Sequence, residues 1–392
     1  MTDPDAVNFR RRSIPRLTLP LGGLYDRSHV PRRWIHHSRR RVKKTTSLST
    51  LSTDQLNYLN IGLMLVTAWA AFVKPFELFL FVYALLGPLH YLTEISWLHD
   101  RKYFTRGRND YFVLVAFAAI IAIVDMRIVP DLPAWLRVAV TYLAFGNALV
   151  FVFVSTGRRR LFYFLALLAT TGLVLRIDFF QSLFSVLLPT IVHVFVFTGL
   201  FILAGALKGR SVSGISSLAV FGLCSLSFFI LGPARSDGQV GEYVQKTYLV
   251  FAQLNYSLMT PFSQHDLNVP ANVLEYVKYV NTVLYHSPTA QAVMGLIAFA
   301  YTYHYLNWFS KTSIIQWHNI PRSRFLLVMV IWLASIGAYL YDYRFGLRWL
   351  FFLSLTHVFL EFPLNHLSVM NISKELKAIF HPRLTLRRPE KV

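Results

Sequence analysis

The sequence predicts an all-α fold: a polytopic transmembrane helical bundle of about ten spans, with both termini in the cytoplasm. Of the 392 residues, 55% are hydrophobic and 15% are charged, which is too apolar for an ordinary globular protein. The apolar residues also come in blocks of roughly 17–25, the length that crosses a hydrocarbon core at about 1.5 Å per residue. Basic residues gather in the tails and in alternate loops between these blocks.

The apolar blocks define the predicted spans and their order. A tight hairpin is expected between the first two, because only Lys74-Pro75 interrupts the apolar run and proline disrupts the helix that precedes it. The ten predicted spans are 57–73, 76–98, 111–130, 134–155, 161–175, 180–207, 212–232, 288–309, 324–342 and 346–368.

The spans divide the chain into five parts. Residues 1–56 hold twelve basic against four acidic residues and are predicted to form a cytoplasmic tail. Spans one to seven occupy 57–232, and the last three occupy 288–368. Between them, 233–287 has helix-like apolar spacing and is expected to form amphipathic helices on the extracytoplasmic surface. Residues 369–392 form a second basic cytoplasmic tail.

The loops support this topology. With the amino terminus inside, the inside loops read HDRKYFTRGRND, TGRRR, KGRS and SKTSIIQWHNIPRS, whereas the short outside loops read KP, PDLP, RIDFF and YDYRFG. Positive charge concentrates on the predicted inside, as the positive-inside rule requires. The net charge of +20 is therefore explained by anionic lipid headgroups, and no nucleic-acid partner is predicted. We expect a multi-pass protein of an inner or plasma membrane.

The chain contains one cysteine, Cys224, inside an apolar block. One thiol cannot form an internal disulfide, a zinc finger or an iron–sulfur cluster of the ferredoxin type. Any metal ion must therefore be bound by histidine and carboxylate groups.

Two glutamates lie deep within apolar blocks, and the same histidine pattern flanks both. The first motif is His90, Glu94 and His99; the second is His357, Glu361 and His366. Residues at i and i+4 share one helix face, so each Glu and the His before it can face the same ion. The i+9 histidine can join only if the helix ends or bends, and Pro363 provides a reason to bend in the second motif.

The topology brings two further histidines to the same region. His304 and His193 lie in other spans that run from outside to inside, in the cytoplasmic half or near mid-membrane. His318 and Asp100, just beyond the cytoplasmic surface, are candidate outer members. Ionisable groups inside a membrane are costly and are usually functional or paired.

The predicted ligand set is six histidines and two glutamates. Imidazole and carboxylate without sulfur suit non-haem iron, with zinc or manganese as alternatives. Eight ligands are too many for one ion, which predicts two, as in di-iron helical bundles. The metal ligands predicted are His90, Glu94, His99, His193, His304, His357, Glu361 and His366.

The arrangement resembles that of the histidine-rich integral membrane non-haem iron enzymes, which include desaturases, hydroxylases and oxygenases. The likeness is one of chemical plan over about four helices, because the HxxxH and HxxHH boxes of desaturases and hydroxylases are absent here. It implies a metal-dependent oxidoreductase acting on a lipid, hydrocarbon or isoprenoid. Electrons would come from a cytoplasmic donor, since no glycine-rich nucleotide fingerprint follows a strand.

Three alternatives stay open at this stage. The same His and Glu residues could form the transit site of a metal-ion or proton transporter. Paired intramembrane histidines could bind haem for electron transfer, although the glutamates would then be unexplained. A purely structural role for the buried polar groups is the third.

Overall fold

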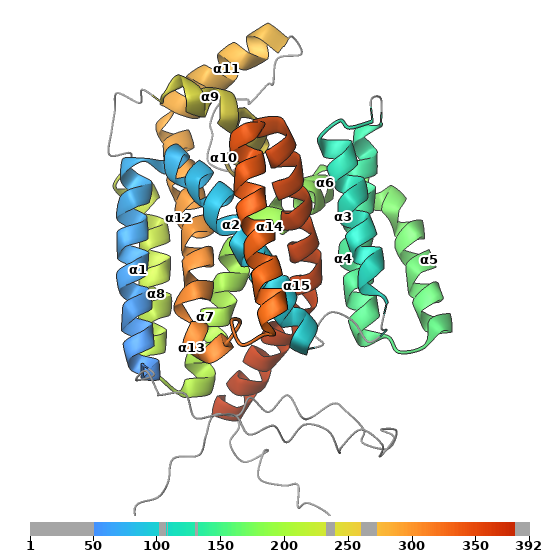
Figure 1. The fold of residues 1–392 in the computed structure, drawn as a ribbon, viewed down its shortest axis with the longest axis vertical. Helices are drawn as coiled ribbons and strands as arrows, with labels where there is room; N and C mark the ends of the chain where they lie inside the picture. Colours follow the sequence, from blue (N-terminus) through green and yellow to red (C-terminus); the bar gives the residue numbers. More distant parts are fainter. Residues whose placement is uncertain are drawn as a thin grey trace, which may run out of the picture. The chain divides into compact units, whose positions relative to one another are not determined.

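The computed structural model describes residues 51–101, 107, 109–129, 132–232, 240–259 and 273–380. These described residues contain helices and no strand, which confirms the all-α prediction. Residues 1–50 of the first predicted tail and 381–392 of the second lie outside the described residues, as do several loops. Residues from Thr50 onward form one compact unit, described by itself here (Figure 1).

Each of the ten predicted spans corresponds to a helix or to a run of consecutive helical segments. The first group is α1 (Thr53–Val73), α2 (Pro75–Arg101), α3 (Tyr111–Asp125), α4 (Ala134–Phe153), α5 (Gly157–Val174), α6 (Asp178–Ser182), η3 (Leu183–Phe197), α7 (Thr198–Gly209) and α8 (Val212–Ile230). The second group is α9 (Glu242–Tyr248), η4 (Leu249–Phe251), α10 (Ala252–Met259), α11 (Val273–His286), α12 (Pro288–Ser310), α13 (Thr312–Ile315), α14 (Arg322–Tyr341) and α15 (Tyr343–Phe380).

Among the described residues, seven helical segments are long and apolar enough to cross a membrane. They include the continuous run from α6 through η3 to α7, whereas α3 is apolar but shorter. Many large apolar side chains on these helices are exposed, such as Leu327 and Leu340 on α14 and Trp69 on α1. Exposed apolar surface on this scale is what a hydrocarbon environment covers. The chain is therefore a helical membrane protein.

Local sequence determines where the first hairpin begins and turns. At the start of α1, the Gln55 N–H donates to the Ser52 hydroxyl and the Ser52 N–H donates to Gln55 Oε1, so that two backbone amides are satisfied. α1 then ends at Val73, and α2 begins at Pro75, where a missing N–H costs nothing. The Lys74-Pro75 break predicted from the sequence is confirmed.

Helix α2 packs against both α12 and α15 at the centre, and it crosses the bundle obliquely behind α14 (Figure 1). One core cluster joins α1, α2, η3, α8 and α12, and a second joins α3, α4 and α15. Figure 1 shows α3, α4 and α5 as a group on one side of the bundle. The candidate site lies where α2 and η3 contact α12 and α15.

Two expectations need correction. α15 does not end near residue 368 but continues through Pro363 to Phe380, so the start of the predicted tail is helical. The segment 233–287 does not lie only on the surface, because Val244, Tyr248 and Tyr256 of α9 and α10 are buried in the main core. Helix α11 matches the amphipathic prediction more closely, with Glu275 and Lys278 exposed and Leu284 buried.

Candidate metal centre

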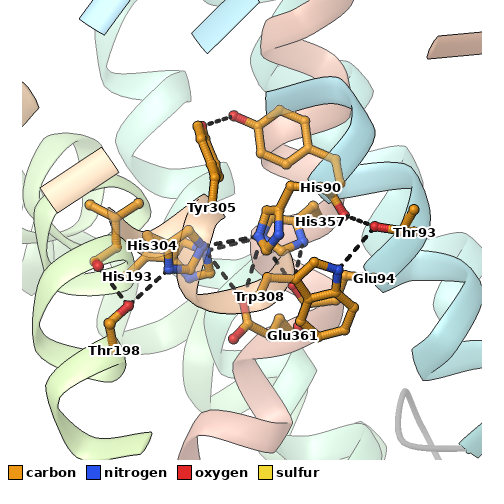
Figure 2. A network of polar contacts seen from close by, with 12 residues as sticks. His90, Thr93, Glu94, His193, Thr198, His304, Tyr305, Trp308, His357 and Glu361 are labelled. Atoms are coloured by element: carbon orange, nitrogen blue, oxygen red, sulfur yellow. Dashed lines mark hydrogen bonds and ion pairs between the residues drawn. The ribbon is translucent and has the colours of Figure 1, made fainter. Parts of the chain in front are cut away.

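Six of the eight predicted ligands meet in one buried cluster (Figure 2). They come from four helical segments: α2, η3, α12 and α15. The cluster consists of His90, Glu94, His193, His304, His357 and Glu361. None is more than 7% exposed, so the site is closed to bulk water.

The two i, i+4 pairs face the cluster as the sequence predicts. On α2, His90 Nε2 lies 3.2 Å from Glu94 Oε2. On α15, His357 Nε2 lies 3.4 Å from Glu361 Oε2. Each pair shares one face because residues four apart on an α-helix are stacked above one another.

Contacts between helices bring the imidazoles together. His304 Nε2 lies 3.0 Å from His90 Nε2, and His193 Nε2 lies 3.0 Å from His357 Nε2. Glu361 Oε2 of α15 is 3.2 Å from His193 Nε2. The donor atoms of four helical segments therefore converge, which the spacing within any one segment cannot show.

These separations match those of ligands around shared metal ions. Two donors at about 2.1 Å from one ion are about 3.0 Å apart at right angles and about 3.4 Å apart at tetrahedral angles. Two groups have mutually close ligand atoms, all within 4.8 Å of one another: His90, His304 and His357 form one, and His193, His357 and Glu361 form the other. The donor atoms therefore have the spacing that metal coordination requires.

The charges of the cluster also fit a cation. Glu94 and Glu361 are 3% and 2% exposed, and within the described part of the chain their ion-pair contacts are with histidines. Among the described residues, the Oε2 atom of each has contacts with histidine nitrogens but no hydrogen bond. Buried carboxylates without a cation are strongly unfavourable in a low-dielectric interior. A metal ion beside these oxygens would remove that penalty.

His357 occupies the middle of the cluster. Its Nε2 faces His193 and Glu361, while its Nδ1 lies 3.6 Å from Glu94 Oε2 on the opposite side of the ring. The two nitrogens of one imidazole cannot bind the same ion. The ring therefore lies between two groups of donor atoms.

The outer contacts include several residues that the sequence did not single out. The hydroxyl oxygen of Thr198, at the start of α7, lies 2.9 Å from His304 Nδ1. The Tyr91 ring stacks on His357, and its hydroxyl is 2.6 Å from that of Tyr305. Trp308 donates to Thr93 on the neighbouring helix α2 (Figure 2). An ordinary threonine or tyrosine in an apolar run carries no sequence signal of such a role.

The structure does not bring the two i+9 histidines into the cluster. The His99 side chain is 61% exposed and lies beside Asp100. His366 packs on Phe362, one turn earlier, and its Nδ1 is 3.3 Å from the Phe362 carbonyl oxygen. Pro363 does not redirect the helix enough to turn His366 inward, since α15 continues past it. Neither residue belongs to the two ligand groups found among the described residues.

The candidate outer members also lie elsewhere. Asp100 pairs with Arg324 of α14, with its Oδ1 2.5 Å from the Arg324 guanidinium. The His318 ring lies against Trp317 beyond the end of α13. With His99 and His366 also outside the cluster, six of the eight candidate ligands remain together.

Comparisons of the chain with protein-family models, curated proteins and solved structures found no match.

Proposed function

We propose that this protein is a membrane-embedded metalloenzyme with a non-haem, dinuclear iron centre that oxidises a lipid-like substrate. The observation that carries the proposal is the convergence of four imidazoles and two otherwise unneutralised carboxylates in a closed site. Donors of this type without sulfur suit iron, with zinc and manganese as the competing ions. When bound, iron would supply the capacity to activate O₂, with electrons from a separate cytoplasmic donor.

The residues themselves have separable tasks in this proposal. His90, Glu94 and His304 would hold one ion, and His193 and Glu361 the other, with His357 between them. Thr198 orients the His304 ring from outside, as outer partners of metal-bound histidines do. The dry surroundings exclude water, which would otherwise compete for the site and weaken its electrostatics.

The geometry is less favourable to the two competing functions. In bis-histidine haem ligation, a porphyrin lies between the two imidazoles, whereas here the facing nitrogens of His90 and His304 are 3.0 Å apart. A transit site for ions needs access from both membrane faces, and all six cluster residues are buried. Transport therefore requires the buried cluster to open toward both membrane faces in turn.

Elemental analysis of the purified full-length protein tests the proposal. We expect about two iron ions per chain, and a loss of most of the metal in both Glu94→Gln and Glu361→Gln, because each change removes a buried anionic ligand. His99→Ala and His366→Ala are matched controls, since these histidines lie outside the cluster, and both should keep the metal. Less than about one transition-metal ion per wild-type chain would overturn the proposal.

A further inference from the structure

Two adjoining cavities lie between the α3–α4 pair on one side and η3, α10 and α15 on the other. The inner cavity has a volume of about 290 Å³ and the outer one about 690 Å³. The residues that line both are Asp125, Arg137, Ser185, Val186 and Gln253. These shared walls make the two cavities successive parts of one path.

The inner cavity ends close to the metal centre. Thr190, Tyr301 and Ser354 line it, and each precedes a cluster histidine by three residues, about one helical turn. Helices α12 and α15 run in the same direction, from the end of the bundle where α9 and α10 lie (Figure 1). One layer of side chains separates cavity from cluster: Ser354 contacts the Tyr91 hydroxyl, and the Tyr91 ring stacks on His357.

The lining changes in character along the path. At the junction, Arg137 Nε lies 3.1 Å from Asp125 Oδ1, and the same guanidinium donates to the Ser185 carbonyl oxygen at 2.5 Å. The pair is neutral as a whole but offers both hydrogen-bond donors and acceptors. Farther in, the walls are largely apolar and aromatic. They include Ile121, Leu254, Leu347, Phe251 and Phe351.

We propose that this path binds an elongated lipid-like molecule with one uncharged polar end, a hydroxyl or carbonyl group. The polar end hydrogen-bonds beside Asp125 and Arg137, and the apolar chain extends into the inner cavity toward the metal centre. A charged end would be unfavourable, because Asp125 and Arg137 already neutralise each other and the site has little water to solvate a third charge. This inference rests on the proposed function and specifies its substrate class.

Photolabelling of the full-length protein in lipid nanodiscs tests the proposal. The probe is a long-chain primary alcohol with a diazirine at the far end of its chain. We expect labelled peptides to contain residues of the inner cavity, such as Tyr301, Ser354 and Phe351. Labelling confined to the lipid-facing surfaces of α1 and α14 would overturn the proposal.

A blocking variant and a matched control sharpen the test. Ser185→Trp places an indole where the two cavities meet and should reduce cavity labelling at least about fivefold. Ser182→Trp adds the same side chain three residues earlier, at an exposed position that lines neither cavity, and should leave labelling unchanged. Equal labelling in both variants would contradict the path. A carboxylic acid probe of equal length should label several-fold less, and equal labelling by it would refute the uncharged end.

Metal content measured on the same preparations separates this inference from the proposed function, and circular dichroism shows that each variant is folded. Cavity labelling without bound metal would overturn the enzyme proposal and leave the binding site standing. Bound metal without cavity labelling would overturn the binding site alone.

Discussion

His357 lies at the centre of the candidate metal site. His357 is completely buried, and both of its ring nitrogens face other donors of the cluster. Among the described residues, the Nδ1 atoms of His90, His193 and His357 have no hydrogen-bond partner, whereas His304 Nδ1 contacts Thr198. His304 is therefore the histidine whose ring orientation a neighbouring hydroxyl most clearly determines.

Replacing Thr198 by valine tests that role. The change removes the hydroxyl and nearly preserves the side-chain shape, so we expect the affinity for Fe²⁺ to fall by about tenfold or more, as it does for outer partners of metal-bound histidines. Anaerobic titration of metal-free protein measures this affinity. Thr302→Val is the matched control, because Thr302 is buried on the same helix as His304 and its hydroxyl has no partner. Unchanged affinity in Thr198→Val would remove Thr198 from the site.

Among the helical segments, η3 has the most unusual winding. It is wound as a π-helix over 15 residues and contains both Pro189 and His193. Such winding is rare, and where it occurs it is often found at functional sites. The wider winding of a π-helix changes the direction in which each side chain leaves the helix. Counting α-helical turns therefore could not predict that His193 faces His357.

The close approach of α14 and α15 gives a second prediction at this scale. A Cβ atom added at Gly346 would lie 2.2 Å from the Tyr339 Cα atom, so the two helices must separate in Gly346→Ala. We expect a loss of about 1–3 kcal/mol in the free energy of unfolding. Thermal unfolding in detergent gives the direction of the change.

Gly337→Ala is the control for this pair. Gly337 lies on α14 with nothing within 4 Å of an added Cβ atom. Alanine there should raise stability by up to about 1 kcal/mol, because it favours the helix more than glycine does. A Gly346→Ala protein as stable as Gly337→Ala would show that the helices do not meet at this point.

The orientation of the bundle in the membrane is predicted from the distribution of basic residues. Apolar side chains exposed on α1, α8 and α14 identify the lipid-facing surfaces, but they do not distinguish inside from outside. The distribution of basic residues predicts that the α14–α15 turn is extracytoplasmic and that the end of α15 is cytoplasmic.

Cysteine labelling tests this orientation. Tyr341 is 94% exposed at the α14–α15 turn, and Lys374 is exposed near the end of α15. In a Cys224→Ala background, a membrane-impermeant maleimide should label Tyr341→Cys in intact cells and Lys374→Cys only after the membrane is opened. The reverse pattern would invert the topology and place the metal centre nearer the opposite face.

The helices were largely predictable because membrane spans are coded locally. Length and hydropathy predicted a helix in every place where the structure has a candidate span, and Lys74-Pro75 predicted the first turn. Two features were not predictable in this way. α15 continues beyond its apolar part because nothing in 369–380 breaks a helix, and α9 and α10 are buried because the bundle offers them a core.

The two His–Glu pairs follow from local spacing, since residues four apart on a helix share a face whatever surrounds them. The fold was needed to see that His193 and His304 join these pairs and that His99 and His366 do not. It was also needed to place Thr198 and Tyr91 beside the cluster, because contacts across helices depend on helix rotation, winding and crossing. Those are decided by the packing of the whole bundle rather than by spacing along one segment.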